Sequence, residues 1–237
     1  MEYQDLKHLA LEYEDSLSQV EKMLAEETNN SDFEFVNKAA NHISLYQGKR
    51  LRPLLVVAVA KCYGPVTTRH ICFAVVAELL HTATLLHDDV LDEADMRRHK
   101  KNVKSEWGNQ TSVLLGDYLF ARSFRILSQL ENQSVFSLIA QTTQEICEGE
   151  LLQTSYTWKT DMSQSLYKVI IQKKTAELFA ASCMGSAILS GVPDEQVVTL
   201  GEYGRKIGMA FQVTDDILDL AGNSIHEGKT LGTDLKK

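Results

Sequence analysis

Apolar residues recur at every third or fourth position along most of the chain, a spacing that predicts amphipathic helices. Gly64-Pro65 ends one of these segments, and Pro193 followed by the capping residue Asp194 begins another. The polar stretch 96–108 is expected to form a loop or an irregular helix, and the Gly-rich, charged stretch 222–237 a loop. The predicted helices cover residues 6–24, 33–43, 54–63, 67–93, 109–131, 133–154, 162–190 and 194–222.

The sequence shows no internal repeat, no low-complexity tract and no convincing strand pattern. We therefore expect one all-α domain over residues 1–237, built of long antiparallel helices. Of the 237 residues, 44% are apolar and only three are proline, whereas a β-sandwich needs frequent turn residues. The longest uncharged run, 178–192, is shorter than the roughly 18–20 apolar residues that cross a bilayer, so we expect no transmembrane segment and a cytoplasmic protein.

The chain carries 32 acidic and 24 basic residues, a net charge of -8, which argues against a broad nucleic-acid-binding surface. Its four cysteines, Cys62, Cys72, Cys147 and Cys183, have neither metal-site nor disulfide spacing. We expect them to be small buried side chains in a reducing compartment.

Three aspartates interrupt an otherwise apolar predicted helix. Asp88, Asp89 and Asp92 fall within one arc of roughly 100° when they are projected onto a helix at about 100° per residue. His81 and Thr84, in the two preceding turns, project in nearly the same direction. The sequence therefore predicts a carboxylate cluster at one end of a helix face that is small or apolar below it.

The same D-D-x-x-D pattern returns as Asp215, Asp216 and Asp219 in the last predicted helix, with Gln212 on the same arc. Like charges four residues apart destabilise a helix by about 0.2–0.5 kcal/mol per pair, so each cluster calls for a compensating positive charge. A single cluster is also compatible with a solvated acidic face. Two such clusters in apolar helices favour binding of a hard cation such as Mg²⁺, which prefers carboxylate oxygens.

Basic residues accompany both clusters. The segment 48–53 places three of them just before a helix N-terminus, where backbone N–H groups also attract anions. On its own this segment is also compatible with a basic loop that aids solubility. No P-loop and no G-x-G-x-x-G is present, so a diphosphate is favoured over a nucleotide. The basic residues near the clusters are Lys49, Arg50, Arg52, Arg97, Arg98, Lys173, Lys174 and Lys229.

Six motifs, taken in their order and spacing, make the chain resemble the trans-type polyprenyl diphosphate synthases over residues 30–237, and most closely the bacterial long-chain, octaprenyl-like enzymes. They are GKRLRP at 48–53, HTATLLHDDVLDEADMRR at 81–98, GNQTSVLLGDYLFARSF at 108–124, GELLQ at 149–153, KTAELF at 174–179 and GMAFQVTDDILD at 208–219. The resemblance implies the all-α isoprenoid synthase fold around a central apolar cavity. It also implies that relatives continue through further C-terminal helices beyond residue 237.

The resemblance implies roles for the residues at matching positions. Mg²⁺, three ions per active site, would be bound by Asp88 and Asp92, with Asp89 in support, and on the opposite wall by Asp215, Asp216 and Asp219. The allylic diphosphate would be contacted by Arg97, Lys174 and Lys229, with Thr175 and Gln212 near its C–O bond. Isopentenyl diphosphate would be bound by Lys49, Arg52, His81 and Arg98.

The implied activity is the Mg²⁺-dependent, head-to-tail condensation of isopentenyl diphosphate with an allylic diphosphate, in a homodimer. In the family, bulky residues four or five positions before the first aspartate block elongation, and here those positions hold the small Thr84 and Ala83. We therefore expect a product longer than fifteen carbons. The alternatives are a geranylgeranyl diphosphate synthase, a non-catalytic subunit of a heteromeric synthase and a terpene cyclase. Intact aspartate motifs argue against the second, and the isopentenyl diphosphate residues argue against the third.

Overall fold

The computed structural model describes residues 13–44, 48–97, 100–157 and 162–221. The described helices are α2 (Glu14–Thr28), α3 (Glu34–Ser44), α4 (Leu51–Tyr63), α5 (Thr68–Leu91), α6 (Val103–Trp107), α7 (Asn109–Gln129), α8 (Gln133–Ser155), α9 (Gln164–Ile171), the π-helical turn η1 (Gln172–Ala176), α10 (Glu177–Leu189) and α11 (Asp194–Ala221). Two short strands, β1 (Met96–Arg97) and β2 (Lys100–Lys101), pair antiparallel between α5 and α6. The prediction of an all-α fold is confirmed.

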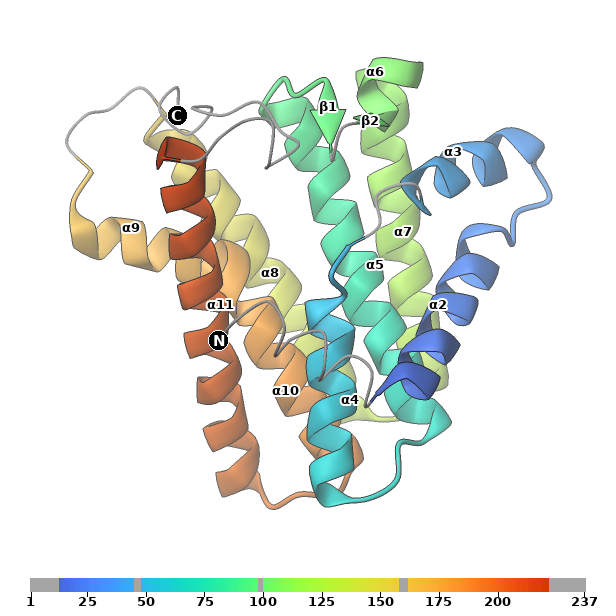
Figure 1. Cartoon of the computed structure of the whole chain (residues 1–237), viewed down its shortest axis with the longest axis vertical. Coiled ribbons are helices and arrows are strands. Elements are labelled where there is room, and N and C mark those ends of the chain that lie inside the picture. The colour runs from blue at the N-terminus through green and yellow to red at the C-terminus, as the bar shows by residue number, and fades with distance from the viewer. Residues whose placement is uncertain (1–12, 45–47, 98–99, 158–161, 222–237) are drawn as a thin grey trace.

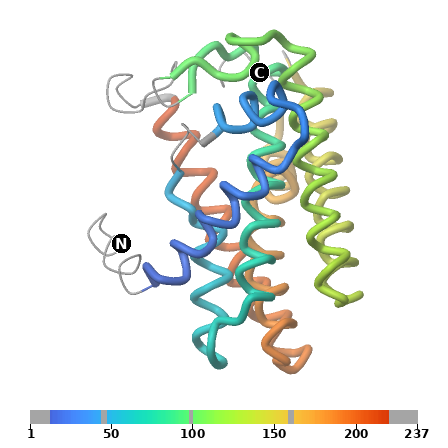
Figure 2. Tube along the Cα trace, turned by 90° about the vertical axis from the view of Figure 1, so that its right-hand side faces the viewer, coloured from blue at the N-terminus to red at the C-terminus, as the bar shows by residue number. Residues whose placement is uncertain are grey.

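The long helices α4, α5, α7, α8, α10 and α11 run along the long axis of the molecule (Figure 1), and the view at a right angle shows the same alignment (Figure 2). Helix α5 lies in the centre of the bundle and packs against α2, α4, α7 and α10. Helix α10 packs on α11 as well, so it separates α5 from α11. The order of the elements therefore brings the two aspartate-bearing helices to either side of α10.

Burial explains why α5 occupies the centre. Its residues Phe73, Ala74, Val75, Val76 and Ala77 are each 0% exposed, so this stretch is apolar around its whole circumference. Helix α5 is also the one described helix that is long and apolar enough to cross a membrane, but 67% of its most apolar window is buried inside the protein. The central helix of a helical bundle has the same apolar composition as a membrane span, so burial in the bundle accounts for the composition of α5.

The helix ends are set by local signals. Thr67 and His70 form a reciprocal capping box at the start of α5, and Gly64, in an extended backbone conformation, follows the end of α4. Pro53 lies in the first turn of α4, where a proline is tolerated, so the helix begins three residues earlier than predicted. Residues 1–12, the start of the first predicted helix, lie outside the described residues, as does the predicted loop 222–237.

Three predictions were wrong in detail. The stretch 96–108, predicted as a loop or an irregular helix, contains the short helix α6 but also the hairpin β1–β2, for which the sequence shows no strand pattern. The segment predicted as one helix over 162–190 is divided by η1 into two α-helices. Cys62 is exposed because it lies in the exposed last turn of α4, and Cys147 because it lies on the solvent-facing side of α8; only Cys183 is fully buried.

Candidate active site

Both aspartate clusters lie at helix C-termini. Helices α5 and α11 run in the same direction and end at the same, upper end of the bundle in Figure 1. The C-terminus of a helix carries partial negative charge, so a carboxylate there is destabilised, typically by about 0.3–1 kcal/mol. Neither helix has a basic residue in its last turn to offset this. The two clusters therefore create a strongly negative end of the molecule that favours cations.

Lys174, in the π-helical turn, contacts the first cluster. Its Nζ lies 3.8 Å from Asp88 Oδ1 and 2.5 Å from Glu150 Oε2, a carboxylate on α8. All three side chains are about four-fifths buried. Burial, opposed by Lys174 and reinforced by Glu150 and Asp92, raises the pKa of Asp88 to about 6. The pKa of Lys174 is also raised: its burial opposes the charge, and Asp88 and Glu150 outweigh that effect.

Thr175, the next residue, is linked to the second cluster by hydrogen bonds through Gln212. Its Oγ1 donates a hydrogen bond of 2.7 Å to Gln212 Oε1, and Gln212 Nε2 donates one of 2.8 Å to Asp216 Oδ1. The other oxygen of Asp216 accepts a hydrogen bond of 2.5 Å from the hydroxyl of Tyr167 on α9. Consecutive residues of one π-helical turn thus reach the aspartate clusters of two different helices. This is the observation that joins the clusters into one site.

Two glycines let the neighbouring helices approach this turn closely. A Cβ at Gly149 of α8 would lie 2.8 Å from the backbone nitrogen of Lys174. A Cβ at Gly208 of α11 would lie 2.6 Å from Cα of Ala176. Real Cβ atoms do not come so near to backbone atoms, so any side chain at either position would displace the turn. The GELLQ and GMAFQVTDDILD motifs therefore also contain residues that pack the site.

Gly149→Ala is expected to lower kcat by about 10- to 100-fold, because displacing Lys174 by a fraction of an ångström to about 1 Å misaligns the groups around the substrate. Gly201→Ala, on α11, is the matched control. Its Cβ would meet only the flexible end of Met184, so its activity should stay close to that of the unmodified protein. Equal activities of Gly149→Ala and Gly201→Ala would contradict a role for this close packing.

The carboxylates of the first cluster have different partners: Asp88 pairs with Lys174 and Asp89 with Arg97. Asp89 is 1% exposed and lies on a different side of α5 from Asp88, where its Oδ1 accepts hydrogen bonds from Arg97 Nε and Nη2 at 3.0 and 2.8 Å. Consecutive residues of a helix point about 100° apart, which separates the two carboxylates. The prediction that Arg97 contacts the allylic diphosphate is not tested by this ion pair. Asp92 is the C-cap of α5 and is half-buried.

In the second cluster, Gln212 Nε2 donates its hydrogen bond to Asp216, four residues later. Asp215 and Asp216 are half-buried, whereas Asp219 is 1% exposed. Hydrogen bonds from Gln212 and Tyr167 therefore hold Asp216 in place, while Asp219 is buried in the protein.

Of the predicted isopentenyl diphosphate residues, Lys49 and Arg52 lie at the start of α4 and His81 lies in the middle of α5. Arg52 is 7% exposed, its guanidinium lies 4.4 Å from the centroid of the Phe179 ring, and its buried Nε has no hydrogen-bond partner. Burial, opposed by the charge of Glu78, lowers the pKa of Arg52 to about 10. A buried guanidinium with an unused donor is suited to an anion. Lys49 is exposed and His81 is half-buried, while Arg98 and Lys229 lie outside the described residues.

The donor set fits Mg²⁺ bound together with a phosphate rather than alone. In the described part of the chain, no three His, Cys, Asp or Glu side chains converge into a ready-made metal centre. Mg²⁺ commonly takes one or two carboxylates and completes its octahedron with water and substrate phosphate. The charged form of Asp88, whose pKa is raised to about 6 by burial beside other carboxylates, would be stabilised by a cation.

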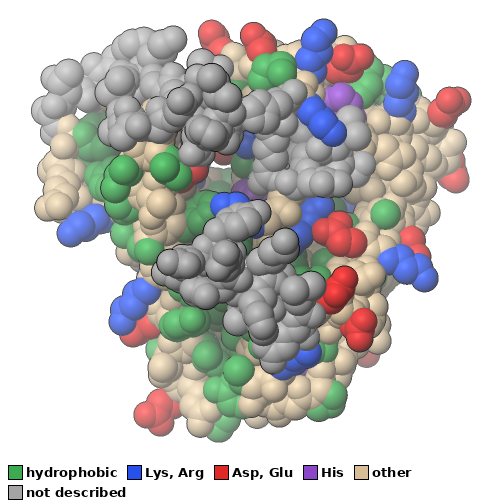
Figure 3. All heavy atoms as spheres, viewed as in Figure 1, with side chains coloured by type: hydrophobic (Ala, Val, Ile, Leu, Met, Phe, Trp, Pro, Cys, Tyr) green, Lys and Arg blue, Asp and Glu red, His purple; other side chains and the backbone are tan. Residues whose placement is uncertain are grey.

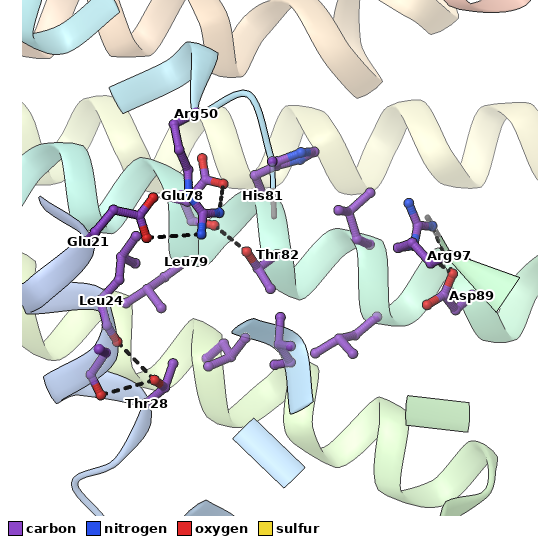
Figure 4. A pocket seen from close by; sticks show the side chains of 16 residues that line it. Glu21, Leu24, Thr28, Arg50, Glu78, Leu79, His81, Thr82, Asp89 and Arg97 are labelled. Carbon is purple, nitrogen blue, oxygen red and sulfur yellow. Dashed lines mark hydrogen bonds and ion pairs between the residues drawn. The ribbon is translucent and has the colours of Figure 1, made fainter. Parts of the chain in front are cut away.

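The predicted chain-length residues lie on α5 below the first cluster. Ala83 is 0% exposed within the main hydrophobic core, and Thr84 is half-buried one turn before Asp88. A cavity of about 100 Å³ adjoins α5 on the side of α2 and α7 (Figure 4). Leu24, Leu86 and Leu119 belong to its apolar part. Neither Ala83 nor Thr84 lines it, so their effect on product length stays a prediction.

A family model described as polyprenyl synthetase matches residues 33–237. The chain belongs to this polyprenyl synthetase family.

Several characterised proteins are similar to the chain. It is 39% identical to the octaprenyl diphosphate synthase of Escherichia coli over 208 residues, which are 88% of this chain and 64% of that protein. It is 40% identical over 223 residues to heptaprenyl diphosphate synthase component 2 of Geobacillus stearothermophilus, covering 93% of this chain and 69% of that one. The chain thus spans slightly less than two thirds of the length of the octaprenyl diphosphate synthase.

The fold is also shared with solved structures. A polyprenyl synthase from Caulobacter crescentus, crystallised with calcium and isoprenyl diphosphate, superposes with a TM-score of 0.93 at 38% identity and covers 97% of this chain and 70% of its own. A decaprenyl diphosphate synthase from Rhodobacter capsulatus superposes with a TM-score of 0.90 at 37% identity, covering 97% of this chain and 70% of its own.

Proposed function

We propose that the chain is a Mg²⁺-dependent trans-polyprenyl diphosphate synthase. It would condense isopentenyl diphosphate head-to-tail with an allylic diphosphate to give a product longer than fifteen carbons. The observation that carries the proposal is the π-helical turn, whose Lys174 contacts Asp88 and whose Thr175 is bonded through Gln212 to Asp216. The similar polyprenyl synthase crystallised with calcium and isoprenyl diphosphate supports a divalent cation and a prenyl diphosphate at this site.

Asp88 and Asp92 on one side, and Asp215, Asp216 and Asp219 on the other, would hold the metal ions, three per active site. When bound, Mg²⁺ supplies stabilisation of the negative charge that develops on the leaving diphosphate. Asp216 can take part although both its oxygens accept hydrogen bonds, because each carboxylate oxygen has a second lone pair.

Lys174 would place a fixed positive charge beside the leaving diphosphate while its ion pairs with Asp88 and Glu150 keep it in position. As the allylic C–O bond breaks, its electron pair remains on the diphosphate. Thr175 and Gln212 would orient polar groups toward the ionising carbon. The double bond of isopentenyl diphosphate then forms the new C–C bond, and a proton passes to the released diphosphate, so no side-chain nucleophile is required.

The isopentenyl diphosphate would bind near the start of α4. Arg52 would pair its buried guanidinium with the diphosphate, and Lys49, His81 and Arg98 would complete the set. Arg97 and Lys229 would contact the allylic diphosphate. The apolar interior along α5 would take the growing chain and exclude water, which would otherwise quench the allylic cation. A homodimer in the cytoplasm completes the proposal.

Two other functions are distinguished by products. The similarity to a geranylgeranyl diphosphate synthase from Methanosarcina mazei, at 37% identity over 203 residues, supports a product of twenty carbons as the second candidate. The relative named as a component of heptaprenyl diphosphate synthase supports a subunit that works with a second chain.

Radiolabelled isopentenyl diphosphate, incubated with farnesyl diphosphate and Mg²⁺, tests the proposal. We expect labelled products longer than twenty carbons, lost when EDTA removes the metal. Products that stop at twenty carbons would support the geranylgeranyl alternative. Absence of any incorporation by the chain alone would contradict the proposal, and a cyclic hydrocarbon would indicate a terpene cyclase.

Thr84→Phe is expected to shorten the product ladder, because a phenyl ring one turn below Asp88 would block the path of the growing chain. Ala83→Phe is expected to do the same, but with a stability loss of about 1–3 kcal/mol from overpacking, since Ala83 is fully buried. Thr84→Val, which conserves volume, should leave the ladder unchanged. Chromatography of the dephosphorylated products measures their chain lengths. Unchanged product lengths in both phenylalanine variants would contradict the proposal that residues 83 and 84 limit elongation.

A further inference from the structure

Arg50 has an unusual backbone conformation next to the proposed isopentenyl diphosphate site. It is the N-cap of α4, with φ 49° and ψ 40°, in the left-handed region. Only two other non-glycine residues in the described part of the chain have positive φ. For a residue with a side chain this conformation is strained, so surrounding contacts must hold it in place.

Two carboxylates from different helices hold the Arg50 side chain. Its Nε and Nη2 donate hydrogen bonds to the two oxygens of Glu21 on α2, at 2.5 and 3.2 Å. Its Nη1 donates to Glu78 Oε1 on α5 at 2.6 Å. Figure 4 shows the guanidinium between the two acids, at the edge of the cavity beside α5. Arg50 thus makes a bidentate contact with Glu21 and a single contact with Glu78, and together these contacts fix the plane of its guanidinium group.

Loss of the contact between Arg50 and Glu78 would be destabilising. Glu78 is 5% exposed, and removing its partner would leave a buried carboxylate with less compensation. Burial opposes the charge on Arg50, but the hydrogen bonds and charges of Glu21 and Glu78 outweigh it and raise the pKa of Arg50. The group is therefore a permanent cation whose position is determined by α2 and α5.

The anchored residue lies between two proposed diphosphate ligands. Lys49 precedes it and Arg52 follows it two residues later, and Glu78 lies one turn before His81 on α5. The carbonyl oxygen of Arg50 accepts the hydrogen bond of Leu54 N–H at 2.9 Å, so residue 50 is where the helical ladder of α4 starts. If residue 50 relaxed to a right-handed conformation, α4 would gain a residue and Lys49 would be carried around the helix axis.

We propose that Arg50 is a positioning residue for isopentenyl diphosphate. Its ion pairs with Glu21 and Glu78 hold residue 50 in the left-handed conformation, and this keeps Lys49, Arg52 and His81 directed at one anion. Arg50 itself does not touch the substrate. This inference rests on the proposed function, because it assigns the diphosphate at this end of α4 to isopentenyl diphosphate.

Calorimetric titration of the whole chain with isopentenyl diphosphate, and separately with farnesyl diphosphate and Mg²⁺, tests the inference. Arg50→Gln is expected to weaken isopentenyl diphosphate binding about tenfold or more, as expected for misplaced ligands, and to leave farnesyl diphosphate binding unchanged. Arg50→Lys, which can still pair with one carboxylate, should lie between the unmodified protein and Arg50→Gln. In steady-state assays the same variants should raise KM for isopentenyl diphosphate more than they lower kcat.

Arg125→Gln is the matched control. Arg125 on α7 pairs with Glu27, which like Glu21 lies on α2, so this change removes one arginine–glutamate pair of α2 and leaves residue 50 untouched, while Glu27 keeps its second pair, with Arg122. Equal loss in Arg50→Gln and Arg125→Gln, or equal loss for both ligands, would show a general structural effect and overturn the inference. Unchanged affinity in Arg50→Gln would overturn it as well. If the unmodified protein binds farnesyl diphosphate but not isopentenyl diphosphate, the proposed function itself fails.

Discussion

Asp88→Asn is expected to reduce turnover by about a thousandfold or more and to leave the fold intact. The carboxylate is a proposed metal ligand, and losing one such ligand removes roughly 4 kcal/mol of transition-state stabilisation. The amide retains the shape of the side chain beside Lys174 and Glu150. Incorporation of labelled isopentenyl diphosphate measures the loss, and calorimetric melting measures the stability.

The pH dependence of stability separates this effect from unfolding. The pKa of Asp88 in the folded protein is about 6, above its ordinary value of 3.8, so its ionisation above pH 6 destabilises the metal-free fold. The folded state binds the proton more tightly than the unfolded chain, and stability from this group therefore falls as pH rises through 6. Metal-free Asp88→Asn should melt higher than the unmodified protein at pH 8, and the difference should shrink at pH 5. A variant that melts far lower at pH 8 would indicate that Asp88 is structural.

Lys174→Met is expected to abolish measurable turnover and also to destabilise the protein, unlike Asp88→Asn. Removing the ammonium leaves Asp88 and Glu150 as neighbouring, largely buried carboxylates, which costs about 3 kcal/mol. In a domain of this size that corresponds to a fall in Tm of roughly 6–12 °C. Melting curves and the labelled incorporation assay measure the two effects in parallel.

Lys173→Met provides the matched control for this variant. Lys173 is the adjacent residue of the same turn, but it pairs with the exposed Glu148 at 2.8 Å, and an exposed pair contributes about 0–1 kcal/mol. Its replacement should change neither Tm nor turnover appreciably. Adding Glu150→Gln to Lys174→Met should recover part of the Tm but none of the activity. Recovery of activity in that double variant would contradict a direct role for Lys174.

The sequence was sufficient to predict the helices and the aspartate clusters, because both depend on short-range periodicity. Apolar spacing of three to four residues located each long helix to within a few residues. The motif order also predicted the family, which the polyprenyl synthetase match over residues 33–237 confirms. The partner of each carboxylate could not be predicted. Asp89 pairs with Arg97, and that arginine lies in strand β1 of the hairpin, which the sequence pattern does not predict.

The π-helical turn could not be predicted from periodicity. One extra residue in a turn leaves the apolar pattern on each side intact, so residues 162–190 read as one helix. The turn changes which way Lys174 and Thr175 face, and its neighbours supply the missing signal. Gly149 and Gly208 allow the close approach of α8 and α11, and their place in two motifs is the clue that a sequence analysis could have used.

Long-range partners were the other omission. Tyr167, Glu150 and Glu78 were given no role, because a single tyrosine or glutamate on a helix has no signature of its own. Tyr167 gains a role only when α9 meets Asp216 of α11, and Glu78 only when α4 begins beside α5. Arg50 could have been singled out as the one basic residue of 48–53 without a proposed ligand role.

The central claim is that the two aspartate clusters act on one ligand, and a double-mutant cycle tests it most directly. Binding of a non-hydrolysable farnesyl thiolodiphosphate in the presence of Mg²⁺ would be measured by calorimetry for the unmodified chain, Asp88→Asn, Asp215→Asn and the double variant. If both clusters bind the same diphosphate, the losses in binding free energy are strongly non-additive. The double variant then binds the analogue only slightly less tightly than the single variant with the lower affinity. Additive losses, or a single variant that binds normally, would contradict the claim.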